Sequence, residues 1–172
     1  MMRSLLFWLV ATVSWFGLAT ICEAVPVIVT FGGPLDEVSS ALAGRFSLGD
    51  RMQVSITYES SWPDGHPDPD TGWYECVLAF SALVDSTMGY TATATDGWWN
   101  INNDFPSGDP FAADQVFAHI NSPASPSGGT LAGPDVAGLP LWTFFLQLHD
   151  DSMTALSSDA LPLSFDPADH FA

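Results

Sequence analysis

Basic residues are almost absent from this chain of 172 residues, which contains no lysine. Its three basic residues are all arginine, against 20 acidic residues, and the formal net charge is −17. Binding to nucleic acid or to anionic lipid headgroups depends on clusters of Lys and Arg. The composition therefore excludes nucleic acid and membrane surfaces as partners.

Cysteine and catalytic motifs are also scarce. The only cysteines are Cys22 and Cys76, and Cys22 lies in an N-terminal segment that we expect to be removed, so no intramolecular disulfide can form. The chain contains no Gly-x-Ser-x-Gly, no His-Glu-x-x-His, no Gly-rich phosphate loop and no paired-cysteine metal site. We therefore expect a protein that is not an enzyme.

The N-terminal segment has the pattern of a secretory signal peptide. Arg3 supplies a positive charge, and an apolar run without charged side chains follows from Leu5 to Leu18. This run is shorter than the roughly 20 residues that a membrane-spanning helix needs, and the small residue Ala24 closes it as a peptidase requires. We interpret residues 1–24 as a signal peptide that is cleaved during export.

Residues 25–172 then form one mature domain, which keeps the net charge of −17 because Arg3 and Glu23 are lost together. Its size is typical of a single domain. The hydrophobic content of the chain, 47%, is too high for disorder. We expect a folded acidic domain that is secreted, extracellular or held in the cell envelope, without membrane insertion of the mature domain.

Alternation of apolar and polar residues indicates β-strands. Met52, Val54, Ile56 and Tyr58 share one face of a segment whose other face is polar, the pattern of a half-buried strand. The segment 74–84 is apolar on both faces, which favours a central strand or a strand bent between two sheets.

Other short strand-like runs are separated by clusters of Gly, Pro, Asp and Ser. Asp96-Gly97 stands between two of them, 90–95 and 98–102, and predicts a hairpin that pairs them directly. Seven or eight such strands predict an all-β fold, a single antiparallel β-sandwich or jelly-roll-like domain.

Four segments carry a resemblance to a known family. They are Ala41-Leu42-Ala43-Gly44-Arg45-Phe46-Ser47-Leu48-Gly49-Asp50, Pro63-Asp64 with Pro67-Asp68-Pro69-Asp70-Thr71-Gly72, Ala79-Phe80-Ser81, and Leu156-Ser157-Ser158-Asp159-Ala160-Leu161-Pro162-Leu163. In order and spacing they resemble the exported β-rich proteins of Gram-negative bacteria that carry a PEP-CTERM sorting signal. The resemblance implies exosortase-dependent sorting to the envelope or matrix, and it implies no activity.

The chain departs from that family at its C-terminal end. After Phe165 there is no Val-Pro-Glu-Pro motif, no hydrophobic helix and no terminal arginine cluster. We therefore expect a protein that is either truncated relative to its relatives or released.

Carboxylates gather in one proline-rich loop. Asp64, Asp68 and Asp70 lie within seven residues, and hard oxygen ligands on a turn suit Ca²⁺. The spacing differs from an EF-hand, because Ala79 stands where a bidentate Glu belongs. The loop is thus a candidate calcium site, with a solvated acidic turn as the alternative.

Adjacent tryptophans provide a second candidate site. Trp98 and Trp99 must point to opposite faces of any strand, so one of them is exposed unless a loop or a second sheet covers it. An exposed aromatic ring can stack on a sugar or anchor a protein. Trp98 and Trp99 are accordingly candidate ligand-binding residues.

These observations favour a secreted, non-enzymatic protein of the cell envelope or extracellular matrix. The alternative is a carbohydrate-binding module, and a weak hydrolase ranks third. Extracellular polysaccharide and envelope or matrix proteins are the expected partners, and calcium is the one candidate cofactor.

Overall fold

The computed structural model describes residues 25–87, 89–105, 113–165 and 171, and within these residues it contains eight strands and no helix. The strands are β1 (Pro26–Pro34), β2 (Arg51–Glu59), β3 (Thr71–Tyr74), β4 (Val77–Asp85), β5 (Tyr90–Ala94), β6 (Trp98–Phe105), β7 (Ala113–Asn121) and β8 (Thr143–Asp150). The expected signal peptide, residues 1–24, lies outside the described residues. No described segment forms a helix long and apolar enough to cross a membrane.

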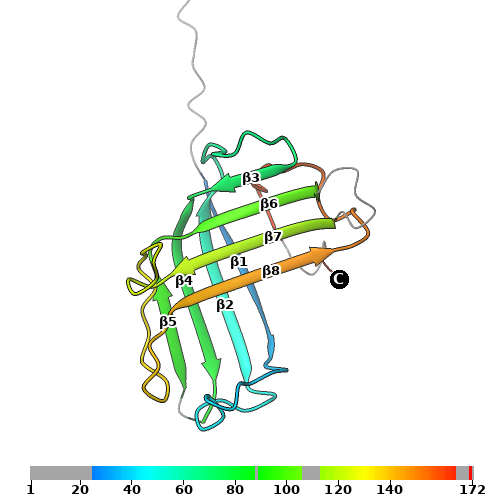
Figure 1. Cartoon of the computed structure of the whole chain (residues 1–172). Helices are drawn as coiled ribbons and strands as arrows, with labels where there is room; N and C mark the ends of the chain where they lie inside the picture. The colour runs from blue at the N-terminus through cyan, green and yellow to red at the C-terminus, as the bar shows by residue number, and fades with distance from the viewer. Residues whose placement is uncertain (1–24, 88, 106–112, 166–170, 172) are drawn as a thin grey trace, which may run out of the picture.

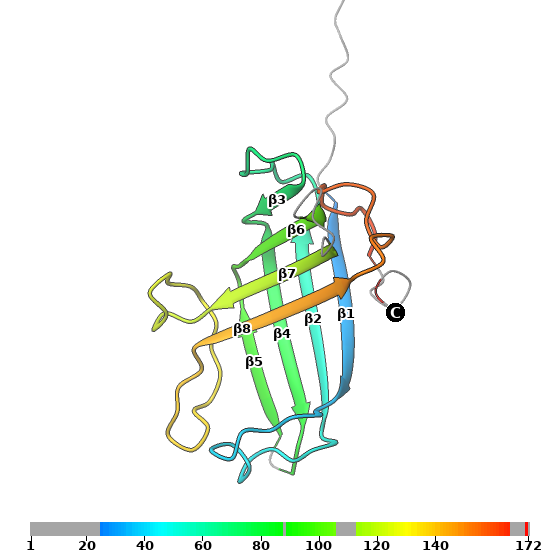
Figure 2. The same cartoon turned by 45° about the vertical axis from the view of Figure 1, so that its right-hand side comes forward.

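The strands form two antiparallel sheets that pack face to face, which confirms the predicted β-sandwich (Figure 1). The first sheet has the order β1-β2-β4-β5, and the second has the order β3-β6-β7-β8. The strands of the two sheets cross at a steep angle, which Figure 2 shows from the side. Sheets that cross in this way cover each other only in part.

The core lies between the sheets and follows the alternation of the strands. In β2, Val54, Ile56 and Tyr58 are buried while the residues between them are more exposed, as the sequence pattern predicts. Trp99 and Ile101 of β6 meet them from the second sheet, and the rings of Tyr58 and Trp99 make an edge contact at 5.3 Å. Such edge-to-face aromatic pairs add to the stability gained from burial.

The chain passes from the second sheet to the first between β3 and β4. Of the two alternatives for segment 74–84, the bend between two sheets is therefore confirmed. β4 is not covered on both faces, because Leu78 and Leu83 are exposed. Cys76 lies in this two-residue connection and is 1% exposed. Burial raises the pKa of its thiol to about 12, so Cys76 is an inert apolar side chain rather than a nucleophile.

A later passage between the sheets, at Asp96-Gly97, corrects one prediction. β5 pairs with β4 and β6 pairs with β3 and β7, so Asp96-Gly97 connects the two sheets and closes no hairpin. Gly97 adopts a φ of +151°, and a Cβ there would collide with Ile120 and the carbonyl oxygen of His119. Glycine is needed here because the chain crosses closely over β7. The resulting Asp-Gly pair is the same pair that favours a tight hairpin, so the sequence pattern is the same in both cases.

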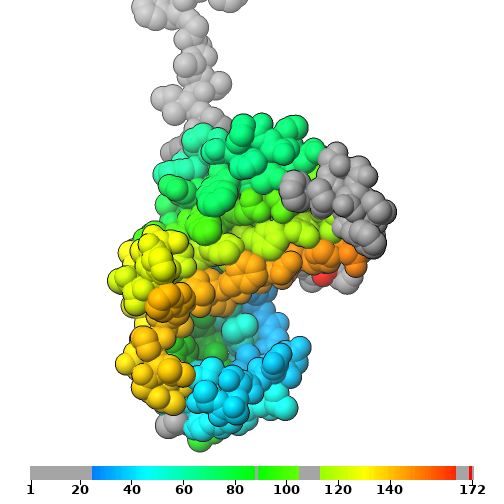
Figure 3. Space-filling model, in the orientation of Figure 1, coloured from blue at the N-terminus to red at the C-terminus, as the bar shows by residue number. Residues whose placement is uncertain are grey.

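Loops complete the core where the second sheet does not reach. The loops 35–50 and 131–142 cover the lower end of the first sheet and leave an apolar cavity of about 310 Å³. Figure 3 shows the hollow between the two loops. Trp142 lines this cavity and is 51% exposed.

Candidate functional site

A row of aromatic side chains crosses the outward face of the second sheet. It consists of Trp73 on β3, Trp98 on β6, His119 on β7 and Phe145 on β8, and we call it the aromatic row. Trp73 stacks on Trp98 at a centroid distance of 4.9 Å and an interplanar angle of 3°. Trp98 stacks on His119 at 4.2 Å and 12°, and His119 meets Phe145 edge-on at 4.5 Å.

Strand register builds this row. His119 pairs with Trp98 on one side and with Phe145 on the other, so the three side chains leave the same face at the same level. Trp73 pairs with Asn100 and reaches Trp98 diagonally. A loop also fixes the backbone of Trp73, because its N–H donates to Asp64 Oδ1 at 2.8 Å and its carbonyl accepts the N–H of Gly65 at 2.9 Å.

The stacking leaves one large ring face free. Trp98 lies between rings on neighbouring strands on both sides, so both of its faces are covered. Trp73 stands on the edge strand β3 and has a stacked ring on one side only. It is 42% exposed, so its free face is the platform that the row offers to a ligand.

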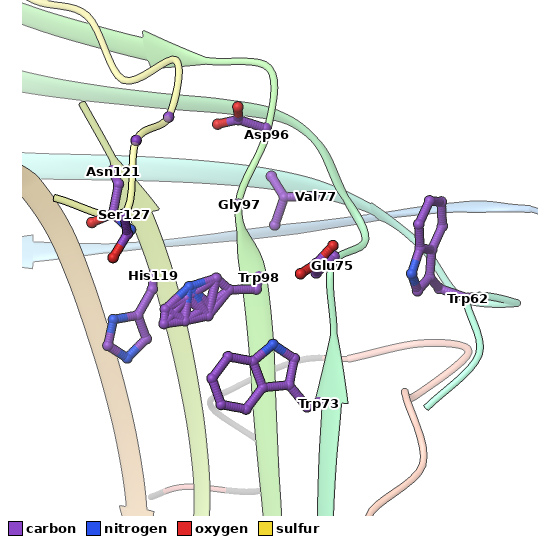
Figure 4. Close-up of a pocket in the computed structure, with 12 residues that line it drawn as sticks. Trp62, Trp73, Glu75, Val77, Asp96, Gly97, Trp98, His119, Asn121 and Ser127 are labelled. Atoms are coloured by element: carbon purple, nitrogen blue, oxygen red, sulfur yellow. The ribbon is translucent and has the colours of Figure 1, made fainter. Parts of the chain in front are cut away.

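A groove of about 640 Å³ opens beside this platform, and we call it the Trp73 groove. Trp62, 40% exposed, stands on one side, and His119, Asn121 and Ser127 stand on the other (Figure 4). Trp98 forms part of the floor. Aromatic rings with a few polar groups between them are typical of small-molecule and sugar sites.

Two carboxylates lie between the sides of the groove, those of Glu75 and Asp96 (Figure 4). Asp96 Oδ1 accepts hydrogen bonds from the N–H and the hydroxyl of Thr130, at 3.0 and 2.8 Å, and so ties the 122–130 loop to the groove. Glu75 is exposed and makes no hydrogen bond or ion pair within the described part of the chain. Its carboxylate is available to a ligand.

The groove holds no positive charge at neutral pH. None of its lining residues is Lys or Arg. Burial lowers the pKa of His119 below its ordinary value, so its imidazole is uncharged. The charges of the groove are therefore the two carboxylates alone.

The structure separates the two predicted ligand-binding tryptophans, as their adjacency requires. Trp98 joins the aromatic row, whereas Trp99 is 2% exposed and packs against Tyr58 in the core. The expectation for Trp99 is therefore corrected: a ring buried between two sheets does not contact a surface ligand. Trp98 itself stacks on the ring of Trp73 and forms only part of the floor of the Trp73 groove.

The acidic loop uses its carboxylates within its own turn. Asp64 Oδ1 accepts the N–H groups of His66 and Trp73, and Asp68 Oδ1 accepts that of Asp70. Among the described residues no group of three or more His, Cys, Asp or Glu is arranged to hold a metal ion. The geometry gives the expected calcium site no support, and calcium binding there stays a prediction.

Sequence reasoning missed Trp62, Trp73 and Glu75. Trp73 and Glu75 lie two residues apart, so a common face could have been inferred from strand periodicity. Their meeting with Trp62 and Trp98 depends on the pairing of β3 with β6, which no local pattern specifies.

The chain matches no family model, and comparison with the curated proteins and with the solved structures gives no match. The resemblance to PEP-CTERM proteins therefore stays an expectation from the sequence segments.

Proposed function

We propose that the protein is an exported, non-enzymatic component of the cell envelope or extracellular matrix that binds polysaccharide in the Trp73 groove. The observation that carries the proposal is the free face of Trp73, 42% exposed and held rigid by the stack behind it. An exposed ring fixed in advance loses little conformational entropy when a ligand binds. This favours the carbohydrate-binding alternative among the functions that the sequence suggests.

The chemistry of the groove suits a sugar. A pyranose ring has an apolar face of C–H groups, which packs on an aromatic ring, and a rim of hydroxyls that need hydrogen-bond partners. Trp73 and Trp62 offer the rings, Glu75 offers a carboxylate beside them, and Asn121 offers an amide on the opposite side of the groove. The combination explains why an aromatic surface is left open to solvent.

The test is oligosaccharide binding by the purified protein, measured by calorimetry for wild type, Trp73→Ala and Trp142→Ala. Trp142 is a matched control because it is an exposed tryptophan outside the groove. We expect Trp73→Ala to weaken binding roughly tenfold or more, or about 1.4 kcal/mol, and Trp142→Ala to leave it unchanged. Equal effects of the two variants would refute the groove as the site.

The same samples test the non-enzymatic part of the proposal. The oligosaccharides recovered after long incubation should have their original length. New reducing ends that disappear in Glu75→Gln would favour a hydrolase instead.

Export is tested by the mass of the protein outside the cytoplasm. We expect its N-terminus at Val25, within a few residues, because signal peptidase cuts after small residues such as Ala24. A membrane-bound form that keeps Met1 would contradict export with cleavage.

A further inference from the structure

We infer that the Trp73 groove selects polysaccharides that carry free, protonated amino groups, such as de-N-acetylated hexosamine polymers, over neutral ones. This inference rests on the proposed function and narrows its ligand class. The observation behind it is that a sugar stacked on Trp73 would lie next to the carboxylates of Glu75 and Asp96, with no cation in the groove lining.

The carboxylate of Glu75 is central to this selectivity. It is exposed, and within the described residues it has no hydrogen-bond or ion-pair partner that an incoming ammonium group would need to displace. Figure 4 places it between Trp73, Trp98 and Trp62, where a bound sugar would lie. Asp96 adds a second negative charge whose Oδ1 is already fixed by Thr130.

The surroundings strengthen the negative potential of the groove. Asp64 binds the backbone of Trp73, and the acidic loop continues to Asp70. A field of one sign concentrates ligands of the opposite sign and repels acidic polymers.

The two arginines of the described part lie elsewhere. Arg45 belongs to the 35–50 loop and donates to the carbonyl of Gly89, and Arg51 begins β2. Figure 1 places this loop and the start of β2 at the opposite end of the sandwich from β3. The nine residues of β2 alone span roughly 26 Å at about 3.3 Å per residue, which exceeds the Debye length of about 8 Å at physiological ionic strength, so neither arginine offsets the groove charge.

The ligand set that tests this inference varies one chemical group. Three hexasaccharides share a β-1,4-linked glucose backbone and carry at C2 a hydroxyl, an acetamido group or an ammonium group. Binding is measured slightly below neutral pH, at low and at high salt. We expect the ammonium form to bind roughly tenfold tighter than the hydroxyl form at low salt, and the preference to shrink at high salt.

The protein variants identify the carboxylate responsible. Glu75→Gln should remove most of the preference for the ammonium form while it keeps binding of the hydroxyl form. Asp85→Asn, which removes the same charge at the far end of β4, should leave the preference unchanged. Trp73→Ala should weaken all three ligands.

The outcomes separate the inference from the proposed function. If none of the three ligands binds, the proposed function is wrong. If the three bind equally, or if Glu75→Gln keeps the full preference, the inference is wrong and the proposed function stands. Undiminished binding of the ammonium form to Trp73→Ala would indicate unspecific adhesion of a polycation, which also overturns the inference.

Discussion

The outward faces of the two sheets differ in chemistry, although the inward faces of both sheets supply the hydrophobic core. Across the first sheet, a line of small hydroxyl side chains runs through all four strands in register: Thr30, Ser55, Ser81 and Thr93. Across the second sheet, the aromatic row occupies the equivalent place. Burial alternates along β2 and β5 of the first sheet and along most of β7 of the second.

This difference indicates that the outward rings serve something other than the core. The outward face of the first sheet carries hydroxyl and aliphatic side chains, with Ile28 and Leu83 exposed, and none of its outward strand positions is aromatic. A sandwich of this kind therefore needs no exposed tryptophan. Stacked aromatic rings that are left open to solvent are typical of interaction sites. We therefore attribute the aromatic row to ligand binding and the buried Trp99 to stability.

The largest expected effect is a difference in stability between two neighbouring substitutions on β6, one in the core and one on the outward face. Trp99→Ala should lower the free energy of unfolding by roughly 3–5 kcal/mol, because it empties a ring-sized space in the core. Trp98→Ala, one residue earlier, should cost only about 1 kcal/mol because its ring packs on a solvated face. Chemical denaturation measures both, and equal losses would contradict the assignment of the two faces.

The second effect concerns the support that Trp98 gives to Trp73. Trp98→Ala should weaken oligosaccharide binding roughly fivefold, about 1 kcal/mol, because the platform loses the ring that orients it. Trp98→Phe restores a flat ring and should recover most of the affinity. Ser81→Ala on the first sheet is the control and should have no effect. Failure of the phenylalanine to rescue binding would assign Trp98 a direct contact instead.

The third effect concerns acid stability at the end of β8. Asp150 accepts the N–H groups of Ser152, Thr154 and Ala155. Hydrogen bonds from Ser152 and Thr154 lower its pKa to about 2 from the ordinary 3.8. A lowered pKa means stability that is present above about pH 4 and is lost as the pH falls toward 2.

Asp150→Asn removes this titration, so the loss of stability between these pH values should be smaller than in wild type. Melting temperatures across the acid range measure it, with Asp85→Asn as the control. An unchanged acid profile in Asp150→Asn would show that the turn does not depend on the charge.

The smallest expected effect is that of calcium on the acidic loop. If Asp64, Asp68 and Asp70 bind it weakly, calcium equal to its Kd adds about 0.4 kcal/mol, or a degree or so in melting temperature. Magnesium at equal ionic strength should add less. Equal shifts with both ions, or an unchanged calcium shift in the double variant Asp68→Asn with Asp70→Asn, would show that these carboxylates only stabilise their own turn and bind no calcium.

The sequence predicted the fold class because burial alternates residue by residue. The strand of Val54, Ile56 and Tyr58 followed from side-chain polarity, and the bend after Tyr74 was one of the two alternatives that polarity left open. The hairpin predicted at Asp96-Gly97 was wrong because a glycine required for a close crossing and a glycine required for a tight hairpin look alike in the sequence.

The site was predictable only in part. That Trp98 and Trp99 face opposite ways follows from strand geometry, but which of them faces the second layer does not. Trp73 depends on the register of β3 with β6, and Trp62 depends on the path of a loop. Both are set by contacts between distant parts of the chain.

The most direct test of the account follows the tryptophan indole N–H signals by NMR during an oligosaccharide titration. The tryptophans of residues 25–172 are Trp62, Trp73, Trp98, Trp99 and Trp142. We predict that the signals of Trp62 and Trp73 shift most and that of Trp98 less, while those of Trp99 and Trp142 stay in place. Shifts confined to Trp142 or to backbone amides of the first sheet, with Trp73 unmoved, would contradict the central claim that the second sheet carries the binding site.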